Sequence, residues 1–341
     1  MRKTAGIVAS LVLAASVVLT GTSANAASVS IASGGSSFSA GIITACAANY
    51  SGANVTYTSS SSGTGRAAFV AGTFDFAGSD GALTETFAGG AKNNPYTYVP
   101  IVGGPIAIIF NIPGVKTLKL DATTVGKIFK GTINKWNDSA IVALNKTAKL
   151  PNQTIKVNYR NSKSGTNGNF SGYLAANGAA GWTGDQTWTT ATGDGTPTGT
   201  GAGSSSVLVA AVADQAYSVG YADLKDANGQ KLSLVTLKNA AGQFVKPTTA
   251  GASKFIAGQS VASNGFVTFD WAKKVSGGYN ASLITYAIVP TSAGTAEAAA
   301  VKGFVNYMLK SCVPANATKL GYVSLTGAIK TAALNNAKKI K

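Results

Sequence analysis

Short apolar runs alternate with segments of helical spacing along most of this 341-residue chain, and this alternation constrains the fold more than any other feature. The apolar runs have the length and the content of β-branched and aromatic residues typical of strands. They lie at 55–58, 74–77, 98–102, 106–112, 155–159 and 283–289, and helical patterns lie at 67–70, 127–129 and 295–310. Strands interleaved with helices predict an α/β fold with a largely parallel or mixed sheet.

The first 26 residues have the pattern of a secretory signal peptide. Arg2 and Lys3 precede an apolar stretch over 5–20, and 24–26 (Ala-Asn-Ala) is a small-x-small cleavage pattern. The apolar stretch is too short for a membrane span, and no second one of spanning length follows. We therefore expect export with cleavage after residue 26. No cysteine lies near this point for lipid attachment, so the mature protein should be secreted, periplasmic or held non-covalently at the cell envelope.

The chain carries 28 Lys and Arg against 12 Asp and Glu, a net charge of +16. Removal of Arg2 and Lys3 with the signal peptide leaves +14. Such an excess favours anionic partners, among them phosphate and acidic polymers of a cell wall. Nucleic acid suits an exported chain poorly, and no basic-aromatic recognition motif occurs. Most of the lysines are therefore interpreted as a solvated face.

The two cysteines, Cys46 and Cys312, each fall on the apolar face of an expected helix. In an oxidising compartment such a pair favours a disulfide. Two separate buried thiols are the alternative, because free cysteine packs well in cores. The chain has no histidine, and two distant cysteines supply only half of a structural zinc site. We expect neither a metal site nor a cofactor.

Three short polar segments occur where helices should begin, at 35–38, 61–64 and 164–166. Helix starts present free N–H groups and partial positive charge, which favour an anion. Asp80 and Arg160 follow expected strands, at the carboxyl ends where α/β sheets bind ligands. If these groups converge, they form a cradle for a small oxyanion with Arg160 as the cation and Asp80 as an acceptor.

Each charged candidate also has a purely structural interpretation. Asp80 could be an ordinary helix N-cap, and Arg160 could be a surface ion-pair partner. An enzyme is not expected, because the absence of histidine removes the Ser-His-Asp and Cys-His arrangements and no Walker-type phosphate loop occurs. A serine activated by lysine within 162–164 has only adjacency in its favour.

In order and spacing, these segments resemble the phosphate-binding proteins of phosphate-specific ABC importers, a branch of the bacterial periplasmic-type solute-binding proteins. The resemblance is close over 31–174 and thin afterwards. The matching stretches are 35–40, 55–65, 74–80, 100–113, 127–136, 159–170, 219–221 and 321–323.

The resemblance implies a monomeric, two-lobed clamp that encloses phosphate and delivers it to an ABC transporter permease. Lobe I would comprise 27–103 plus 285–341, and lobe II would comprise 104–284. Hinge crossovers would lie near 102–104 and 283–284. Both cysteines then fall in lobe I, which strengthens the expectation of a disulfide.

The resemblance also assigns the ligand contacts residue by residue. Asp80 would accept a hydrogen bond from the ligand, which phosphate near neutral pH can donate and sulfate cannot. Most family members carry an aspartate two residues after the arginine, where it orients that side chain; this chain has Ser162 there, followed by Lys163. The expected phosphate-binding residues are Ser37 (where the family usually has Thr), Phe38, Ser62, Asp80, Arg160, Ser164, Gly165 and Thr166.

Two other functions stay open at this point. A secreted protein of the same fold could act as an adhesin or scavenger for anionic envelope polymers, and a clamp could bind another tetrahedral oxyanion.

Residues 175–206 are crowded with Gly, Thr, Ala and Ser around Trp182 and Trp188. We interpret this stretch as a surface insertion with some packed aromatic contacts.

Overall fold

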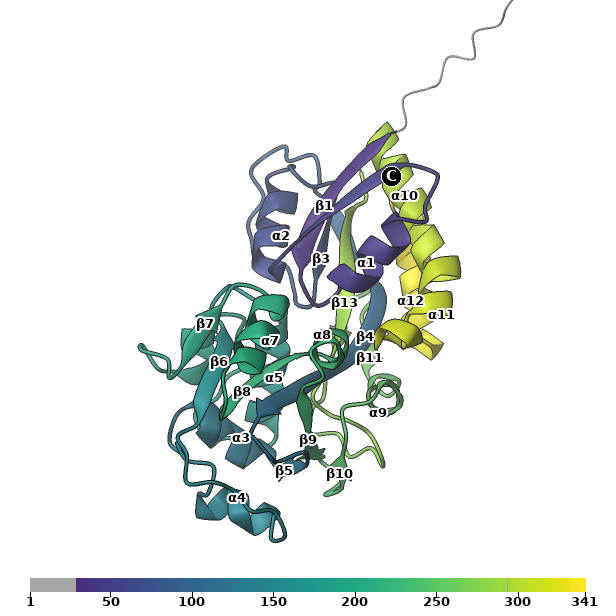
Figure 1. Cartoon of the computed structure of the whole chain (residues 1–341). Coiled ribbons are helices and arrows are strands. Elements are labelled where there is room, and N and C mark those ends of the chain that lie inside the picture. The colour runs from purple at the N-terminus through teal and green to yellow at the C-terminus, as the bar shows by residue number, and fades with distance from the viewer. Residues whose placement is uncertain (1–28, 293) are drawn as a thin grey trace, which may run out of the picture.

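The structure is a computed structural model and describes residues 29–292 and 294–341. The predicted signal peptide lies outside this part of the chain. Figure 1 shows two lobes: the N-terminal strands and C-terminal helices form the upper one, and the middle of the chain forms the lower one. The protein thus has an α/β fold with two lobes.

Strands and helices alternate through most of the chain. The strands are β1 Ser30–Ser36, β2 Asn54–Ser60, β3 Phe76–Ser79, β4 Tyr96–Asn111, β5 Leu118–Leu120, β6 Lys156–Arg160, β7 Thr200–Ala202, β8 Ser218–Asp223, β9 Ser233–Lys238, β10 Phe244–Val245, β11 Ser260–Val261, β12 Val267–Thr268, β13 Ser282–Pro290 and β14 Val323–Ser324. The helices are α1 Ala40–Ala47, α2 Ser62–Val70, α3 Ala122–Phe129, α4 Ser139–Leu144, α5 Gly165–Ala176, α6 Trp188–Thr192, α7 Ser205–Asp214, α8 Leu224–Gly229, α9 Thr249–Ile256, α10 Ala296–Tyr307, α11 Val313–Asn316 and α12 Gly327–Lys338.

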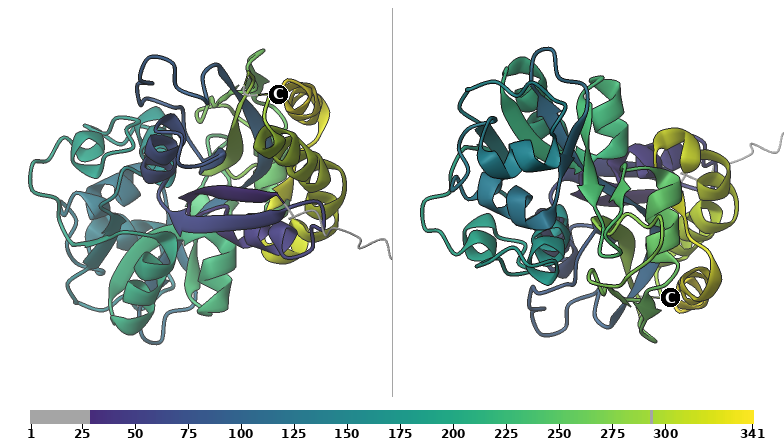
Figure 2. Two further views of the ribbon diagram at one scale, coloured as in Figure 1. Left: turned by 90° about the horizontal axis from the view of Figure 1, so that it is seen from above. Right: turned by 90° about the horizontal axis from the view of Figure 1, so that it is seen from below.

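One mixed sheet connects the two lobes, with the strand order β2-β1-β3-β13-β4-β8-β6-β7. β1, β2 and β3 are mutually parallel at one end, and β6, β7 and β8 are parallel at the other. Figure 2 shows the C-terminal helices beside the N-terminal strands, whereas the middle segment forms the other body. The sheet therefore offers two sets of parallel carboxyl ends.

β4 is a single strand where the sequence analysis predicted two. Its first part pairs with β13 and its second part with β8 and β9, so it passes from one lobe to the other. The two predicted strands, 98–102 and 106–112, left residues 103–105 (Gly-Gly-Pro) between them as a break. That prediction was wrong because the change of partner falls at this point: Pro105 lies opposite Ser282 at the end of the β13 pairing, and Ile106 opens the pairing with β8.

A disulfide joins Cys46 of α1 to Cys312, which ends a π-helical turn after α10. Both residues are buried in the main hydrophobic cluster. The predicted pairing is confirmed. It closes a loop with a sequence separation of 266 residues, and cross-links of this kind typically stabilise a fold by about 2–4 kcal/mol.

Residues 175–206 contain more structure than a surface insertion. Trp188 is buried and stacks on Tyr159 and Tyr221, while Trp182 packs edge-on against Trp188. The predicted aromatic contacts are confirmed. However, β7 in this stretch extends the sheet beside β6. Its sequence, Thr-Gly-Ala, has neither the length nor the apolar alternation that identifies a strand.

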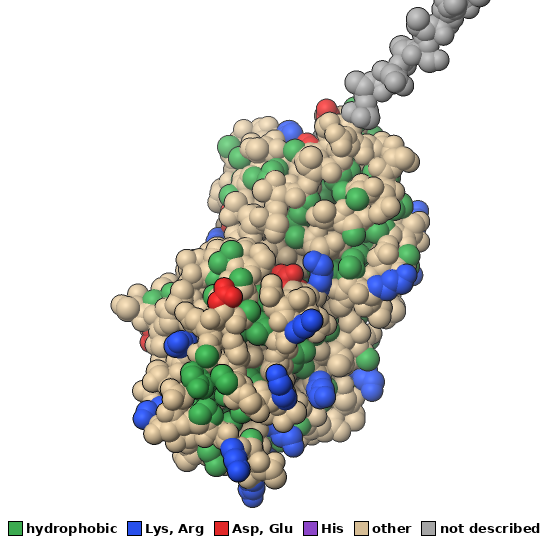
Figure 3. Space-filling model, viewed as in Figure 1, with side chains coloured by type: hydrophobic (Ala, Val, Ile, Leu, Met, Phe, Trp, Pro, Cys, Tyr) green, Lys and Arg blue, Asp and Glu red, His purple; other side chains and the backbone are tan. Residues whose placement is uncertain are grey.

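Positive charge is dispersed on one face of the molecule. On the face drawn in Figure 3, Lys and Arg side chains are scattered over a mostly uncharged surface and do not merge into one patch. Within the described residues, no helix has the length and apolar character needed to cross a bilayer.

Candidate anion-binding site

Four strand-to-helix connections and the end of β3 supply the groups of the candidate site. The connections lead from β1 to α1, β2 to α2, β6 to α5 and β7 to α7. Ser61 is the N-cap of α2, where its Oγ accepts a hydrogen bond from the Thr64 N–H at 3.2 Å. Ser164 is the N-cap of α5. The three predicted helix starts are therefore confirmed, and the start of α7 is a fourth.

Glycines let these helix starts approach the sheet closely. Gly35 has a φ of +126°, and a Cβ there would lie 2.2 Å from the Gly78 carbonyl oxygen. A Cβ on Gly65 of α2 would lie 2.4 Å from the Gly35 Cα. A side chain at either position would separate β1 from α2.

Gly165 brings the start of α5 against the opposite lobe in the same manner. A Cβ on this residue would lie 2.7 Å from the Ser62 Oγ and 2.8 Å from the Asp80 Cβ. The helix starts of α2 and α5 and the end of β3 therefore meet at one place.

Asp80 is buried at this meeting point and accepts hydrogen bonds from hydroxyls of several elements. Ser36 donates at 2.6 and 2.7 Å, and Thr285 at 2.5 Å. Thr166 and Ser62 lie farther away, at 3.3 and 3.5 Å. No helix begins after Asp80, so its interpretation as an N-cap is wrong.

Two opposing influences act on the pKa of Asp80. Burial is the larger influence and raises the pKa of Asp80 above its ordinary value, although the Ser36 and Thr285 hydroxyls and the charge of Arg160 oppose that rise. Hydroxyl donors are compatible with an ionised carboxylate that serves as an acceptor.

Arg160 is buried as well, with 2% of its surface exposed. Its Nη1 donates to the Ser37 Oγ at 3.1 Å, and its Nη2 donates to the Ser162 Oγ and the Gly203 carbonyl, both at 2.9 Å. Within the part of the chain that the structure describes, Arg160 forms no ion pair and its Nε has no hydrogen-bond partner. The interpretation as a surface ion-pair residue is therefore wrong.

The backbone of Arg160 is held from both sides. Its N–H donates to the Tyr221 hydroxyl at 3.0 Å, and its carbonyl accepts from the Asn167 Nδ2 at 2.8 Å. Tyr221 in turn donates to the Asn167 Oδ1 at 2.5 Å. This closed set of bonds fixes the end of β6 relative to α5 and β8.

Ser37 and Phe38 occupy the connection between β1 and α1. The Ser37 Oγ contacts the Ser205 Oγ at 3.0 Å and accepts from the Ser205 N–H at 3.1 Å. The Phe38 N–H donates to the Ser36 Oγ at 3.1 Å, and its carbonyl accepts from the Tyr322 hydroxyl at 2.7 Å. All eight predicted residues thus lie in the region formed by these helix starts.

Three contributors were missed by the sequence analysis. Ser36 was quoted within its segment but not assigned a role. Thr285 is the polar member of the apolar run 283–289, and a register shift between Thr285 and Tyr286 lies at its position. Ser205 begins α7 after the N-cap Ser204, and three serines before an apolar run are a helix-start signal that could have identified it.

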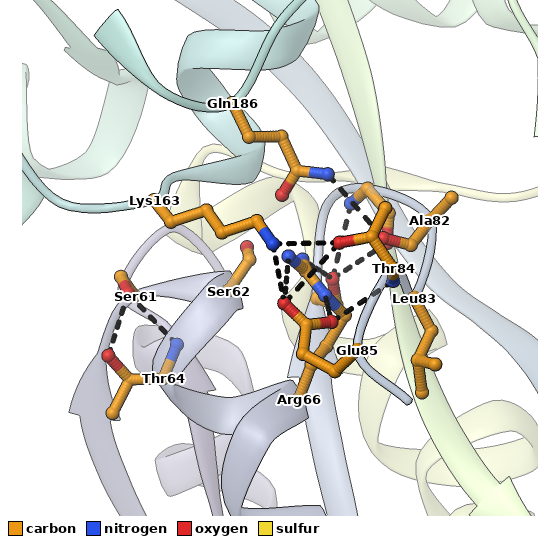
Figure 4. A network of polar contacts seen from close by, with 12 residues as sticks. Ser61, Ser62, Thr64, Arg66, Ala82, Leu83, Thr84, Glu85, Lys163 and Gln186 are labelled. Carbon is orange, nitrogen blue, oxygen red and sulfur yellow. Dashed lines mark hydrogen bonds and ion pairs between the residues drawn. The ribbon is translucent and has the colours of Figure 1, made fainter. Parts of the chain in front are cut away.

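Ser162 and Lys163, which follow Arg160, both form side-chain contacts. Arg160 has no carboxylate two residues later, but the Ser162 hydroxyl and the Gly203 carbonyl hold its Nη2 instead. The ammonium of Lys163 contacts Glu85 at 2.9 Å, as Figure 4 shows. Its charge is therefore paired with a carboxylate.

Taken together, these groups provide many hydroxyl and N–H donors, one cation without a carboxylate partner, and one buried carboxylate. Donors and a cation complement the oxygens of an anion, while a carboxylate accepts a proton-bearing group. The arrangement therefore suits a small oxyanion that carries a proton.

Comparison with known proteins places the chain in a family. Residues 20–311 match the model of the PBP superfamily domain. The phosphate-binding protein PstS3 of Mycobacterium bovis is 32% identical over 282 residues, which cover 79% of this chain and 74% of that protein. The phosphate-binding protein PstS of Haemophilus influenzae is 33% identical over 68% of this chain and 69% of its own length.

A solved structure shares the fold. The high-affinity periplasmic phosphate-binding protein PfluDING aligns with a TM-score of 0.76 and 23% identity, over 90% of this chain and 93% of that one. These relatives are binding proteins by name and not enzymes, in agreement with the expectation from the sequence. The chain belongs to the phosphate-binding protein family of the PBP superfamily.

Proposed function

We propose that this protein captures inorganic phosphate between its two lobes and delivers it to an ABC transporter permease. The observation that carries the proposal is the pairing of opposite chemistries in one buried place: Arg160 without a carboxylate partner among the described residues, and Asp80 surrounded by hydroxyls. Arginine binds phosphate oxygens well, often through two parallel hydrogen bonds. The family membership and the names of the relatives support the same ligand.

The proposed contacts come from the helix starts and the two charged side chains. Phosphate oxygens would take over hydrogen bonds that Ser37, Ser205 and Arg160 now make to one another. Neutral N–H groups and hydroxyls would carry most of the recognition. The assigned ligands are Ser37, Phe38, Ser62, Asp80, Arg160, Ser164, Gly165 and Thr166, with Ser205 added from the geometry.

Asp80 would supply the discrimination between oxyanions. Its carboxylate can accept the proton that phosphate carries near neutral pH. Sulfate brings no proton, so its oxygen would face the carboxylate oxygen as a second acceptor, and an unmade hydrogen bond in a buried place costs about 1–3 kcal/mol or more. Phosphate would therefore be preferred because the binding of sulfate is made less favourable by the two facing acceptors.

The lobes that would close on phosphate are 27–103 plus 285–341 and 104–284. β4 and β13 would act as the two hinge crossovers. Contacts between the lobes support a closed arrangement: the Gly63 N–H donates to the Lys163 carbonyl at 2.9 Å. The segment from α9 to β12, although it belongs to 104–284 in this division, packs against Tyr98 and Tyr286 of the first lobe.

We further propose that the protein is exported, cleaved after residue 26, and works as a monomer in the periplasm or at the cell envelope. A role as a scavenger of anionic polymers gains no support from the face in Figure 3, where positive side chains are dispersed.

The proposal is tested by titrating phosphate-free mature protein, residues 27–341, with phosphate and with sulfate in a calorimeter. We expect phosphate to bind with a micromolar or lower dissociation constant and sulfate to bind at least about tenfold more weakly, a difference of about 1.4 kcal/mol. If neither anion binds below millimolar concentration, the proposed function is wrong. If only another tetrahedral oxyanion binds, the ligand is wrong but the clamp is retained.

A further inference from the structure

Next to the anion-binding site, a chain of charged side chains crosses from one lobe to the other (Figure 4). We propose that Lys163, Glu85 and Arg66 form a closing link that slows the release of the bound anion. This inference rests on the proposed function, because it concerns the rate at which the same site opens. None of the three residues is among the proposed phosphate ligands.

The link has a strong inner contact and a weaker outer one. Arg66 of α2 is fully buried and donates to Glu85 twice, from Nε at 2.6 Å and from Nη2 at 3.1 Å. Lys163 comes from the segment between β6 and α5, and its Nζ lies 2.9 Å from the Glu85 Oε1 and 2.8 Å from the Thr84 Oγ1. Arg66, Thr84 and Glu85 belong to the first proposed lobe, and Lys163 reaches them from the second, as Figure 4 shows.

Both ends of the link adjoin the anion-binding site. Lys163 directly precedes Ser164, the N-cap of α5, and its carbonyl accepts the Gly63 N–H at the start of α2. Arg66 donates from Nη1 to Ser79 at 3.0 Å, and Ser79 directly precedes Asp80. Separation of α2 from α5 would therefore break the backbone bond and the Lys163 ion pair together. A ligand held between these helix starts would leave only after both contacts break.

The exposure of the side chains sets the size of the effect. Lys163 has 43% of its side chain exposed and Glu85 has 15%, so solvent and salt screen this pair in part. A single, partly exposed ion pair stabilises the closed arrangement only weakly. Its loss should therefore change the rate of anion release by about two- to fivefold.

The two basic partners of Glu85 also determine which variant is informative. Removal of Glu85 would leave Arg66 buried with an uncompensated charge and would endanger the fold. Removal of the Lys163 ammonium leaves the Arg66–Glu85 contact in place. Lys163→Met therefore breaks only the part of the link that crosses between the lobes.

The chain offers a matched control in Lys92 and Asp75. Their ion pair has a length of 3.3 Å, and Lys92 has 53% of its side chain exposed. Both residues lie in the first proposed lobe, within 27–103. Lys92→Met removes the same charge and a similar pair without touching a contact between lobes.

The experiment measures phosphate release by stopped flow from the wild-type mature protein, Lys163→Met and Lys92→Met. We expect Lys163→Met to release phosphate about two- to fivefold faster with little change in the association rate, and Lys92→Met to match the wild type. Raising the KCl concentration should speed release from the wild type towards the Lys163→Met rate. Equal release rates for all three proteins would overturn the inference.

A second measurement separates this inference from the proposed function. If the wild type binds no phosphate, the proposed function fails, and the radius of gyration from small-angle X-ray scattering then decides about the link. We expect Lys163→Met to be more open than the wild type and Lys92→Met to be as compact. An unchanged radius for Lys163→Met would overturn the link in that case too.

Discussion

Two arginines are buried in the part of the chain that the structure describes, Arg66 and Arg160, and they differ in what surrounds them. Arg66 forms a two-bond ion pair with Glu85, which itself also contacts Lys163. Arg160 contacts hydroxyls and a carbonyl but no carboxylate within the described residues. One guanidinium is neutralised inside the protein, while the other keeps its charge available.

The difference shows how a buried cation reveals its role. An ion buried without a partner is costly, so a protein gains stability by pairing it or by removing it. Arg66 follows this rule and is interpreted as a structural residue. Arg160 does not follow this rule. A buried cation without a carboxylate partner is expected where a bound ligand supplies the negative charge.

The largest effect should follow from Arg160→Met. We expect phosphate affinity to fall at least about 100-fold, or roughly 3 kcal/mol, because a buried charge contact to the ligand is lost. The free energy of unfolding without ligand should fall by less than about 1 kcal/mol, because removal of an unpaired buried charge offsets the hydrogen bonds that the guanidinium loses. Calorimetry and urea denaturation measure the two quantities. Retained affinity would show that the charge of Arg160 does not serve the ligand.

Arg66→Met should give the reverse pattern. Breaking this buried pair leaves Glu85 partly buried with only Lys163 as a partner, and we expect the free energy of unfolding to fall by about 3 kcal/mol. The folded variant should bind phosphate within about threefold of the wild type. Loss of binding with full stability would remove the contrast between the two arginines.

The contribution of the Arg66–Glu85 ion pair to the stability of the fold should be lost over a defined acidic pH range. Burial raises the pKa of Glu85, but the hydrogen bonds from Arg66 and Lys163 outweigh it and lower the pKa from 4.5 to about 2. A carboxylate with a lowered pKa stabilises the fold above its unfolded pKa, and this contribution is lost as the pH falls from about 4.5 through 2.

Thermal unfolding between pH 7 and pH 2 tests this expectation. Lys163→Met should lose stability at a higher pH than the wild type, because one of the groups that lower the pKa of Glu85 is gone. Lys92→Met serves as the control and should follow the wild type. Coincident curves for all three would mean that Glu85 does not titrate as described.

The smallest effect is expected from Ser162→Ala. Arg160 Nη2 would lose one acceptor at 2.9 Å but keep the Gly203 carbonyl at the same distance. We expect phosphate affinity to fall about two- to fivefold, as for one hydrogen bond of about 0.5–1 kcal/mol. Calorimetry against Ser206→Ala, at the exposed start of α7, provides the comparison. A loss as large as that of Arg160→Met would show that Ser162 is indispensable for the arginine.

Much of the fold could be predicted because local signals agree with it. The strands near 55–58 and 155–159 and the helix starts at Ser61 and Ser164 follow from residue types within a few positions. β4 could not be predicted as one strand, because the change of partner that tolerates 103–105 depends on β13 and β8, which are far away in the sequence.

The candidate site could be predicted only in part for the same reason. Ser37, Asp80 and Arg160 follow strands or precede helices, and those positions are visible in the sequence. Thr285 reaches Asp80 across a separation of 205 residues, and Ser205 reaches Ser37 across 168. The first contact depends on the pairing of β13 with β3, and the second depends on how the two lobes meet. Neither arrangement is encoded in a local sequence pattern.

The central claim is that the Asp80 carboxylate accepts a hydrogen bond from the protonated oxygen of phosphate. The variant Asp80→Asn tests this claim most directly. Calorimetric titration of the wild type and this variant with phosphate and with sulfate gives the ratio of the two affinities. The amide can donate to sulfate, so we predict that the preference for phosphate falls at least about tenfold, or about 1.4 kcal/mol. An unchanged ratio in the folded variant would contradict the claim.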